Sequence, residues 1–553
     1  MSMKKIISLF LITAMLSSSV LVGCSNENKN EATTSTEPKA EKITDPIADI
    51  KAEQSTDKYR NYYEIFVNSF CDSNGDTIGD LQGVISQLDY LNDGDPNSGN
   101  DLGVDGIWLT PIMPSKSYHK YDVEDYYDID EVFGTLEDFD KLVDECHKRG
   151  INIIIDLVLN HISSQNPLYL NAVKEVEEGK LDGDAEYFEI HKKSYFSADT
   201  QVNDLANDYA CEANFSHDMP EWNLNSDKTR KEFAKIAKFW IDRGVDGFRL
   251  DATKFYTNAD TDGAEFLGWF YDTCQEMKPD IYMVGENWTD NSQILEMCES
   301  GIDSFFAFKY AQASGSIVKG ILSESGAGIP GRLMSYENKA VDINKDYINA
   351  LFLSNHDQVR IANALNPLGL SYEKFAASVY MLFPGNPFIY YGEEIGVAAA
   401  ETSSDAYYRS AMIFDSENLP VISVNARDIP IEAPSNGGVK QQLDDENSLL
   451  NFYRRIIKIK LQNPEIARGR ITGVQDFGDA AICAYYIEHN NSKLMIVHNF
   501  SKEQSKTVTI TDDMLKNAVL RADLVTGDSG HIAMVDGKIT LPAQSSVILK
   551  AAE

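Results

Sequence analysis

The sequence predicts an α/β fold, a (β/α)₈ TIM barrel with an inserted domain and a C-terminal antiparallel β-sandwich. Apolar strand-like runs alternate with helical stretches over roughly 400 residues from about residue 59, which is typical of repeated βα units around a parallel sheet. The connection from His161 to Ala234 is longer than one crossover helix, which indicates an inserted domain. After about residue 464, short runs separated by turn residues indicate antiparallel strands.

Eight apolar runs are the predicted barrel strands. Their near-continuous apolar character suits strands that are covered on both faces, and eight such strands can close a barrel. These strands are expected at residues 62–70, 104–112, 152–160, 245–253, 281–287, 301–308, 348–356 and 385–392. A last barrel helix is expected at about 447–462, and sandwich strands at 481–487, 493–498, 506–510 and 545–550.

The chain length and composition bound the domain organisation and the partners. A chain of 553 residues exceeds the size of a single hydrophobic core. We predict the barrel at 58–160 and 226–464, the inserted domain at 161–225 and the β-sandwich at 465–553. The net charge of −37 disfavours nucleic acid, whose phosphates it would repel, and is compatible with a neutral substrate and bound cations. None of the seven cysteines forms a Cys-x-x-Cys pair, so no zinc site is expected. The protein is expected to be a monomer.

The first 57 residues are not expected to belong to a folded domain. Lys4 and Lys5 precede an apolar run that ends Leu-Val-Gly-Cys24, which is the pattern of a secretory signal over 1–24. This ending resembles the bacterial lipobox, which implies lipid attachment to Cys24 at the extracellular face of a bacterial membrane; the alternative is a simple signal peptide. Residues 25–57 are polar, and we predict a disordered tether there.

The stretch Gly244–Lys254 holds two charges in an apolar run. Arg249 and Asp251 are two residues apart, so they point to the same side of a strand. Burial of an unpaired ion costs several kcal/mol, so a pair is expected. The pair is either structural, or it is a carboxylate held ionised by a guanidinium at the end of a barrel strand that carries chemistry.

Polar residues close four of the predicted barrel strands, in the segments Asp156–His161, Arg249–Asp251, Gly285–Trp288 and Asn355–Asp357. Because the C-terminal ends of barrel strands meet on one rim, these groups are expected in one pocket. Three carboxylates in one pocket suit glycoside cleavage, which needs a carboxylate beneath the anomeric carbon and a protonated acid at the leaving oxygen. Neighbouring like charges would help to keep one acid protonated near neutral pH.

Six motifs carry a family resemblance. DLVLNH, GFRLDATK, GENW and SNHD resemble the four signature regions of the α-amylase superfamily of glycoside hydrolases, and WLTPI and MPEWNLN resemble two further regions. The resemblance is ordered and spans roughly residues 59–550. It implies a (β/α)₈ barrel, a domain B after the third strand and a C-terminal β-domain, in agreement with the apolar pattern.

The resemblance also implies roles for individual residues. Asp251 is expected to be the nucleophile, Glu286 the general acid/base, and Asp357 a ligand of the sugar 2- and 3-hydroxyls. Residues implied to bind or orient substrate are Tyr121 as a stacking platform, Asp122 and His119 as further subsite candidates, Arg249 beside the nucleophile, His161 and His356 at sugar hydroxyls, Lys254 on the leaving-group side, and the pair Asp405 and Arg409. Phe255 departs from the histidine that the family often has at this position.

A calcium site is predicted in the loop after the first strand. Oxygen donors are spaced as in an EF-hand loop, although position 12 is Gly83 in place of glutamate. The donors are Asp72, Asn74, Asp76, the carbonyl of Ile78, and Asp80. Relatives that cleave short α-glucans have the same Asp-x-Asn-x-Asp loop, where it binds calcium. The alternative is an Asp/Asn/Gly turn that binds no metal.

Together these features predict a lipid-anchored extracellular α-amylase that cleaves α-1,4-glucosidic bonds of starch and maltooligosaccharides with retention of configuration. MPEWNLN is closer to the form seen in amylases and neopullulanase-like members, whereas the calcium loop favours the glucosidases. α-Glucosidase, neopullulanase and 4-α-glucanotransferase remain alternatives within the superfamily. A non-catalytic glycan-binding protein is the remaining alternative, and the complete carboxylate set disfavours it.

Overall fold

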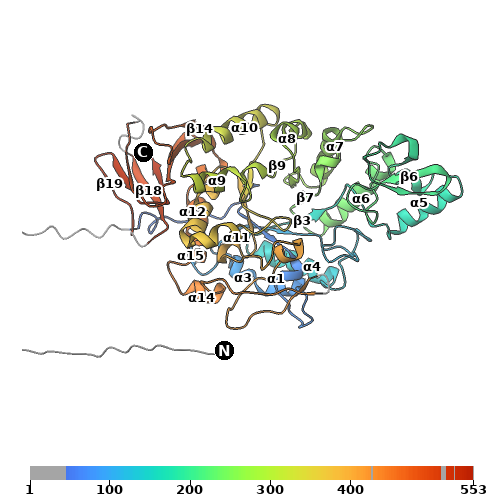
Figure 1. Cartoon of the computed structure of the whole chain (residues 1–553), viewed down its shortest axis with the longest axis horizontal. Coiled ribbons are helices and arrows are strands. Elements are labelled where there is room, and N and C mark those ends of the chain that lie inside the picture. The colour runs from blue at the N-terminus through green and yellow to red at the C-terminus, as the bar shows by residue number, and fades with distance from the viewer. Residues whose placement is uncertain (1–44, 425–426, 512–517, 528–529, 552–553) are drawn as a thin grey trace, which may run out of the picture. The chain divides into compact units, whose positions relative to one another are not determined.

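The computed structural model describes residues 45–424, 427–511, 518–527 and 530–551 (Figure 1). The predicted signal segment 1–24, Cys24 included, and residues 25–44 lie outside the described residues. None of the helices in the described ranges is long and apolar enough to span a membrane.

Eight parallel strands form the barrel that the sequence predicts. They are β1 (Tyr62–Ile65), β2 (Gly106–Leu109), β3 (Asn152–Leu157), β7 (Gly247–Leu250), β8 (Tyr282–Gly285), β9 (Ser304–Phe305), β10 (Ala350–Phe352) and β11 (Asn386–Tyr390). The strand order is β10-β11-β1-β2-β3-β7-β8-β9, and a parallel bridge between Phe306 and Ala350 closes the barrel. Every strand begins within a predicted run and is shorter than that run, because the polar rim residues leave the sheet.

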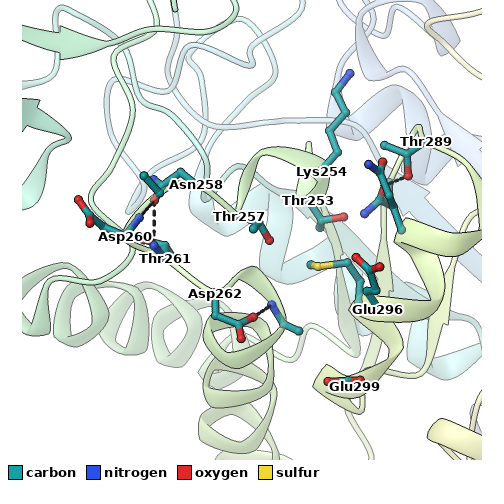
Figure 2. A pocket seen from close by; sticks show the side chains of 15 residues that line it. Thr253, Lys254, Thr257, Asn258, Asp260, Thr261, Asp262, Thr289, Glu296 and Glu299 are labelled. Atoms are coloured by element: carbon teal, nitrogen blue, oxygen red, sulfur yellow. Dashed lines mark hydrogen bonds between the residues drawn. The ribbon is translucent and has the colours of Figure 1, made fainter. Parts of the chain in front are cut away.

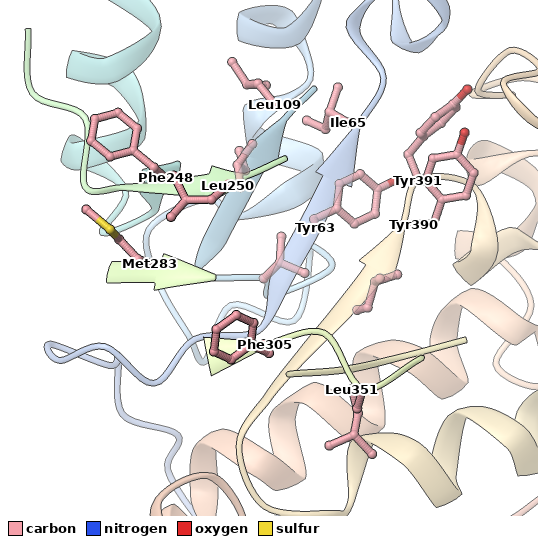
Figure 3. Packing of buried hydrophobic residues seen from close by; sticks show 14 of the residues in the cluster. Tyr63, Ile65, Leu109, Phe248, Leu250, Met283, Phe305, Leu351, Tyr390 and Tyr391 are labelled. Carbon is pink, nitrogen blue, oxygen red and sulfur yellow. The ribbon is translucent and has the colours of Figure 1, made fainter. Parts of the chain in front are cut away.

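Side chains of the barrel strands alternate between the interior and the surrounding helices. Tyr62, Trp108 and Phe388 belong to the interior cluster, and the rings of Tyr62 and Phe388 stack with centroids 4.7 Å apart. The outward residues, among them Tyr63, Leu109, Phe248, Leu250 and Met283, pack in the larger cluster shown in Figure 3. Residues two apart share a side. Arg249, between the outward Phe248 and Leu250, therefore points inward.

Side chains cap the N-termini of several barrel helices. In α4 (Leu136–Lys148), Thr135 and Asp138 form a capping box, and the apolar residues at 139, 142, 143 and 146 are buried with helical spacing. The other barrel helices are α1 (Val67–Phe70), α2 (Leu81–Ser86), α3 (Leu88–Leu91), α6 (Asp227–Asp242), α7 (Gly263–Met277), α8 (Asn291–Met297), α9 (Ser316–Ser323), α10 (Ile329–Ile343), α11 (Ile361–Leu365), α12 (Leu370–Met381), α13 (Asp405–Tyr408), α14 (Val439–Leu443), α15 (Leu449–Gln462) and α16 (Pro464–Arg468).

The long connection between β3 and α6 carries a small structure of its own. It contains α5 (Pro167–Glu177) and an antiparallel sheet ordered β4-β6-β5, made of β4 (Ile190–Lys192), β5 (Val202–Asp204) and β6 (Tyr209–Glu212). A bridge between His161 and Glu221 joins the two ends of this connection. The inserted segment therefore leaves and re-enters the barrel at neighbouring points, beside His161.

The C-terminal part is an antiparallel sandwich, as predicted. One sheet is ordered β14-β15-β16-β21-β18 and the other β17-β20-β19. Their apolar faces share one core, in which Ala484, Val497 and Leu549 from the first sheet lie with Val508 and Ile539 from the second. The strands are β14 (Arg470–Val474), β15 (Ile482–His489), β16 (Ser492–Asn499), β17 (Lys506–Thr509), β18 (Val519–Val525), β19 (Met534–Val535), β20 (Lys538–Leu541) and β21 (Ser545–Lys550).

The prediction of a disordered tether over 25–57 is wrong for its described part, residues 45–57. Ile47 and Ala52 are buried, and Ala52 exchanges two backbone hydrogen bonds with the side chain of Asn97. Asp45 accepts two hydrogen bonds from Arg455, at 2.8 and 2.9 Å. Asp57 also pairs with Arg468 at 2.6 Å. The prediction from polar composition was wrong because a few buried side chains and ion pairs can hold a short segment against a folded surface.

Candidate active site

A cavity of about 440 Å³ contains the predicted catalytic carboxylates. It is lined by Asp251, Glu286 and Asp357 together with His119, Tyr121, His161, Phe215, Ser216, Met219, Ala252, Lys254, Trp288, Asp405 and Arg409. Most of these residues directly follow barrel strands β3, β7, β8 and β10 or belong to the loops between strands and helices. Its volume is within the ~300–1,000 Å³ of small-molecule sites.

Arg249 contacts three carboxyl groups, one at the end of its own strand and two from the neighbouring strands β3 and β8. It is fully buried on β7, and its Nη1 donates to Asp251 Oδ1 at 2.6 Å and to Asp156 Oδ1 at 2.8 Å. Its Nη2 lies 3.4 Å from Glu286 Oε2. Asp156 pairs with Arg249 in the β3–β7 register, so the parallel sheet itself brings this acid and base together. The predicted nucleophile and the predicted acid/base therefore share one guanidinium.

The turn after β7 orients Glu286. Ala252 adopts a left-handed conformation with φ +53°, which is uncommon outside glycine. In this turn its backbone N–H donates to Glu286 Oε2 at 2.9 Å. One carboxylate oxygen of Glu286 is thus held by Ala252 and Arg249. The strained residue lies between the two predicted catalytic groups, where such strain is typical of functional sites.

Burial and like charges raise the pKa values of these carboxyls. Burial raises the pKa of Asp251, and the charge of Arg249 opposes this without cancelling it. Burial also raises the pKa of Glu286; Arg249 opposes this rise, and Asp251 and Asp357 add to it. The pKa of Asp156 rises to about 7 for the same reason, burial against Arg249. One guanidinium cannot neutralise three carboxylates, so the cluster holds a proton near neutral pH.

Asp357 belongs to a second charge network that keeps it ionised. Its carboxylate lies 3.1 Å from His356 Nε2 and accepts a hydrogen bond from Arg409 Nη2 at 2.9 Å. Burial alone would raise the pKa of Asp357, yet the charges of His356 and Arg409 lower it below its ordinary value. The side chain of Asp357 is 32% exposed, against 10% for Asp251 and 12% for Glu286. A charged, accessible acceptor suits sugar hydroxyls.

Glu64 is a site residue that the sequence analysis missed. It is buried on β1, and its Oε1 lies 2.6 Å from His356 Nδ1 and accepts from the His356 backbone N–H at 3.2 Å. Burial would lower the pKa of His356, but Asp357 and Glu64 raise it to about 9. A charged residue inside an apolar strand is the signal that identified Arg249. The same signal, a glutamate inside the apolar run of β1, could have indicated Glu64.

Tyr121 joins the two charge networks. Its hydroxyl donates to Asp156 Oδ2 at 3.0 Å and lies 2.7 Å from His356 Nε2. The rings of Tyr121 and His356 stack with centroids 5.6 Å apart, and Tyr121 lines the cavity as the predicted platform would. His356 itself is fully buried and does not line the cavity, and its Nε2 lies beside Tyr121 and Asp357; its contact with a sugar hydroxyl stays a prediction.

His161 and the late Asp/Arg pair lie at the cavity as predicted. Burial lowers the pKa of His161 to about 4, so its ring is neutral, and within the described residues Nε2 has no hydrogen-bond partner. Arg409 pairs with Asp405 at 3.1 Å, and the hydroxyl of Tyr118 bonds both. A buried imidazole with a free nitrogen suits a hydroxyl group of a ligand.

Asp122 lies apart from the cavity, and Lys254 lies beside Phe255, where the family often has histidine. Asp122 does not line the cavity; its carboxylate accepts hydrogen bonds from Ser115 and Ser117. Phe255, where the family often has histidine, packs edge-on against Phe215 with centroids 5.0 Å apart, and Lys254 Nζ lies 4.6 Å from the Phe255 ring. Phe255 does not line the cavity itself but packs behind Phe215 and Lys254, which do.

The predicted calcium loop forms a turn stabilised by its own side chains. Asp72 accepts backbone hydrogen bonds from Asn74, Gly75 and Thr77, and Asp76 accepts one from Ile78. Asp80 caps α2 through the Gly83 N–H at 2.7 Å. The oxygen donors are those of a hard cation. Over the described ranges, however, the only three acidic or histidine side chains close enough to share an ion are Asp45, Asp523 and His531.

Comparisons with known proteins identify the family. Residues 64–469 match the family "Alpha amylase, catalytic domain", and residues 482–548 match "Alpha-amylase SusG C-terminal domain". Alpha-amylase 3 of Dictyoglomus thermophilum is 36% identical over 453 residues, which cover 80% of this chain and 85% of that protein. Oligo-1,6-glucosidase of Parageobacillus thermoglucosidasius is 28% identical over 500 residues, which cover 77% of this chain and 87% of that protein. The structure of Eubacterium rectale Amy13B matches with a TM-score of 0.82 at 36% identity, and the match covers 91% of this chain and 97% of that one.

The chain therefore belongs to the α-amylase family of glycoside hydrolases.

Substituting Glu64→Gln tests the link from Glu64 to Asp357. The neutral amide should lower the pKa of His356 from about 9, so its positive charge beside Asp357 is lost at lower pH. The pKa of His356, followed through the NMR signals of its ring, should then fall by about 1 unit. Glu394→Gln, at a buried glutamate bonded to Tyr63 and Tyr90, is the matched control. An unchanged His356 pKa, or the same shift in the control, would contradict the assignment.

Proposed function

We propose that the protein is an α-amylase, a retaining hydrolase of α-1,4-glucosidic bonds in starch and maltooligosaccharides. The observation that carries the proposal is the gathering of Asp251, Glu286 and Asp357 around one cavity, with two of them on the same guanidinium. A retaining mechanism needs its nucleophile and acid/base close together on either side of the scissile bond. The name and coverage of the Dictyoglomus relative favour amylase activity.

The proposed reaction has two displacements. Arg249 holds Oδ1 of Asp251, so Oδ2 attacks the anomeric carbon while Glu286 gives its proton to the leaving glycosidic oxygen. The bond from the anomeric carbon to that oxygen breaks, and a glycosyl ester forms on Asp251. Glu286, now a carboxylate, takes a proton from water, and the water oxygen displaces Asp251. Asp357, held ionised by His356 and Arg409, would strengthen its bonds to the sugar hydroxyls as positive charge develops.

α-Glucosidase, neopullulanase and 4-α-glucanotransferase are the alternatives, and the oligo-1,6-glucosidase relative keeps the glucosidase alternative open. The product pattern from soluble starch, maltoheptaose and pullulan separates them. A ladder of short maltooligosaccharides supports the amylase. Glucose alone indicates exo action, panose from pullulan a neopullulanase, and products longer than the substrate a transferase.

Substituting Glu286→Gln should lower kcat about 10²–10⁴-fold, because the amide cannot exchange a proton with the leaving oxygen. The shape of the site is kept, since Oε2 accepts from Ala252 and an amide oxygen can do the same. Glu276→Gln, an exposed glutamate on α7, is the control and should keep full activity. Unchanged turnover in Glu286→Gln would remove this residue from the mechanism. Loss of all activity in the unmodified protein would favour a glycan-binding role.

We also propose calcium binding at Asp72, Asn74, Asp76, Ile78 and Asp80, where a bound ion would tie the loop before α2 to the barrel. A chelator should then lower Tm by a few degrees, since saturation at 100 times Kd is worth about 2.7 kcal/mol. The double substitution Asp72→Asn with Asp76→Asn should remove the calcium dependence. A Tm that responds to neither chelator nor substitution would exclude the site.

The last element of the proposal is anchoring at the extracellular face of a bacterial membrane by a lipid on Cys24. It rests on the apolar run and the Leu-Val-Gly-Cys ending in the sequence. Cells labelled with radioactive palmitate should give a labelled protein, and Cys24→Ala should not incorporate label. Label in the alanine variant would contradict the anchor.

A further inference from the structure

Arg409 belongs to a loop, whereas the barrel strands position the neighbouring site residues directly. Glu286 follows β8, and its backbone oxygen accepts hydrogen bonds from the N–H and the Oγ1 of Thr253, each at 2.9 Å (Figure 2). Arg409 instead follows an exposed stretch, residues 400–403, well after the end of β11. Another part of the molecule must therefore set the place of Arg409.

Arg360 contacts the backbone on both sides of Arg409. The side chain of Arg360 is buried, and its Nε donates to the Tyr408 backbone oxygen at 2.8 Å. Its Nη2 donates to the Ser410 backbone oxygen at 3.3 Å, and its Nη1 to the Tyr391 backbone oxygen at 2.7 Å. One guanidinium thus joins the end of β11 to both neighbours of Arg409.

The two tyrosines at the end of β11 support the same arrangement (Figure 3). The ring centroids of Tyr390 and Tyr391 lie 4.3 and 4.6 Å from the guanidinium carbon of Arg360. The Tyr390 hydroxyl donates to the Tyr408 backbone oxygen at 3.1 Å, and the Tyr391 hydroxyl to the Ser410 backbone oxygen at 2.6 Å. Each of these two oxygens therefore accepts from the arginine and from a tyrosine, which matches its two lone pairs.

Arg360 differs from the other buried arginines in its partners. Arg60, Arg249 and Arg409 each form an ion pair with a carboxylate. In the described part of the chain Arg360 forms none, and it bonds to three backbone oxygens instead. A buried charge is costly unless its hydrogen bonds are satisfied, so the loop is favoured in the conformation that brings these oxygens to the guanidinium. The place of the Arg409 backbone follows from that requirement.

The position of the Arg409 backbone decides what its side chain can reach. Its Nε donates to the His356 backbone oxygen at 3.1 Å, and its Nη2 to Asp357 Oδ1 at 2.9 Å. Its Nη1 donates to the Tyr118 hydroxyl at 2.8 Å. A guanidinium is a rigid fork, so these bonds form together only from one backbone position. Arg360 follows Asp357 in the same loop after β10, and it thereby ties the loop of Asp357 to the loop of its cation.

We propose that Arg360 is a positioning residue for the reaction. It sets the place of Arg409 and thereby the hydrogen bond that holds Asp357 toward the substrate. Arg360 does not line the cavity that contains Asp357, so it acts through Arg409. The inference rests on the proposed function, because it needs Asp357 to bind sugar hydroxyls more strongly in the transition state. Its consequence is that Arg360 affects turnover only while Arg409 is present.

The test is a double-mutant cycle on kcat and KM for maltoheptaose. Arg360→Lys keeps the charge, but an ammonium group lacks the fork that reaches three oxygens. It should lower kcat about 10-fold, the effect of lost hydrogen bonds to a charged group, with KM changed less than twofold. In an Arg409→Lys background the same substitution should lower kcat less than twofold, because the fork that Arg360 positions has gone.

Tyr391→Phe is a second and milder variant. It removes only the hydroxyl that shares the Ser410 oxygen with Arg360, and the ring that packs on the guanidinium is kept. It should lower kcat about 3-fold, the effect of one neutral hydrogen bond, and again only while Arg409 is present. This variant tests the inference even where Arg360→Lys does not fold.

Arg60→Lys is the matched control. Arg60 is also buried and donates to a backbone oxygen, that of Ser55, but it precedes β1 at the opposite end of the barrel, so its kcat should change less than twofold. Equal losses with and without Arg409, no loss in either variant of the clamp residues Arg360 and Tyr391, or the same loss in Arg60→Lys would overturn the inference. An unmodified protein that does not cleave maltoheptaose would overturn the proposed function itself, which separates the two failures.

Discussion

The guanidinium of Arg249 is the interaction on which the site depends. It is fully buried inside the barrel, where an unpaired charge would cost several kcal/mol. The requirement for partners constrains the register of β3 and β8 against β7. Asp156 on β3 must lie opposite Arg249, and β8 must end where Glu286 can reach the guanidinium. Trp108 closes the apolar side, with its ring 5.3 Å from the guanidinium carbon. A slip of one residue in either strand would leave the charge without partners.

A second network runs from Glu64 through His356 to Asp357 and Arg409. It keeps Asp357 charged, whereas the carboxyls around Arg249 have raised pKa values. The Arg249 cluster holds more carboxyls than positive charges, and burial raises the pKa of Glu286, which favours the protonated form that a general acid needs. Around Asp357 two cations face one accessible carboxylate, which stays charged. Tyr121 bonds to both networks, so a substrate that displaces its hydroxyl would affect both halves of the site. Two carboxyls with different roles thus follow from the different charge balance around them.

The sequence predicted those parts of the structure that depend on local pattern. The eight barrel strands and the inward position of Arg249 follow from apolar runs and strand alternation, and the rim position of Asp251, Glu286 and Asp357 follows from barrel geometry. The partners of these residues were less predictable, because they come from distant strands. Glu64 precedes His356 by 292 positions, and no local pattern connects them.

The differences between prediction and structure have the same origin. Asp122, which was expected to face the ligand, does not line the cavity, and its carboxylate accepts hydrogen bonds from Ser115 and Ser117 of its own loop. Residues 45–57 were assigned to a disordered tether on composition, although Asp45 finds Arg455 on α15. The sandwich strands β14, β18, β19 and β20 were not predicted, since polar residues interrupt their short apolar runs. In each case a tertiary partner outweighed the local signal.

The most direct test of this account is to trap the covalent intermediate. The protein would be incubated with a 5-fluoro-α-glucosyl fluoride, which forms the glycosyl ester readily and hydrolyses it slowly, then digested and sequenced by mass spectrometry. The account predicts one added sugar on the peptide that contains Asp251, with no label in Asp251→Asn. Label on another carboxylate, or steady turnover of natural substrate by Asp251→Asn, would contradict the assignment of Asp251 as the nucleophile held by Arg249.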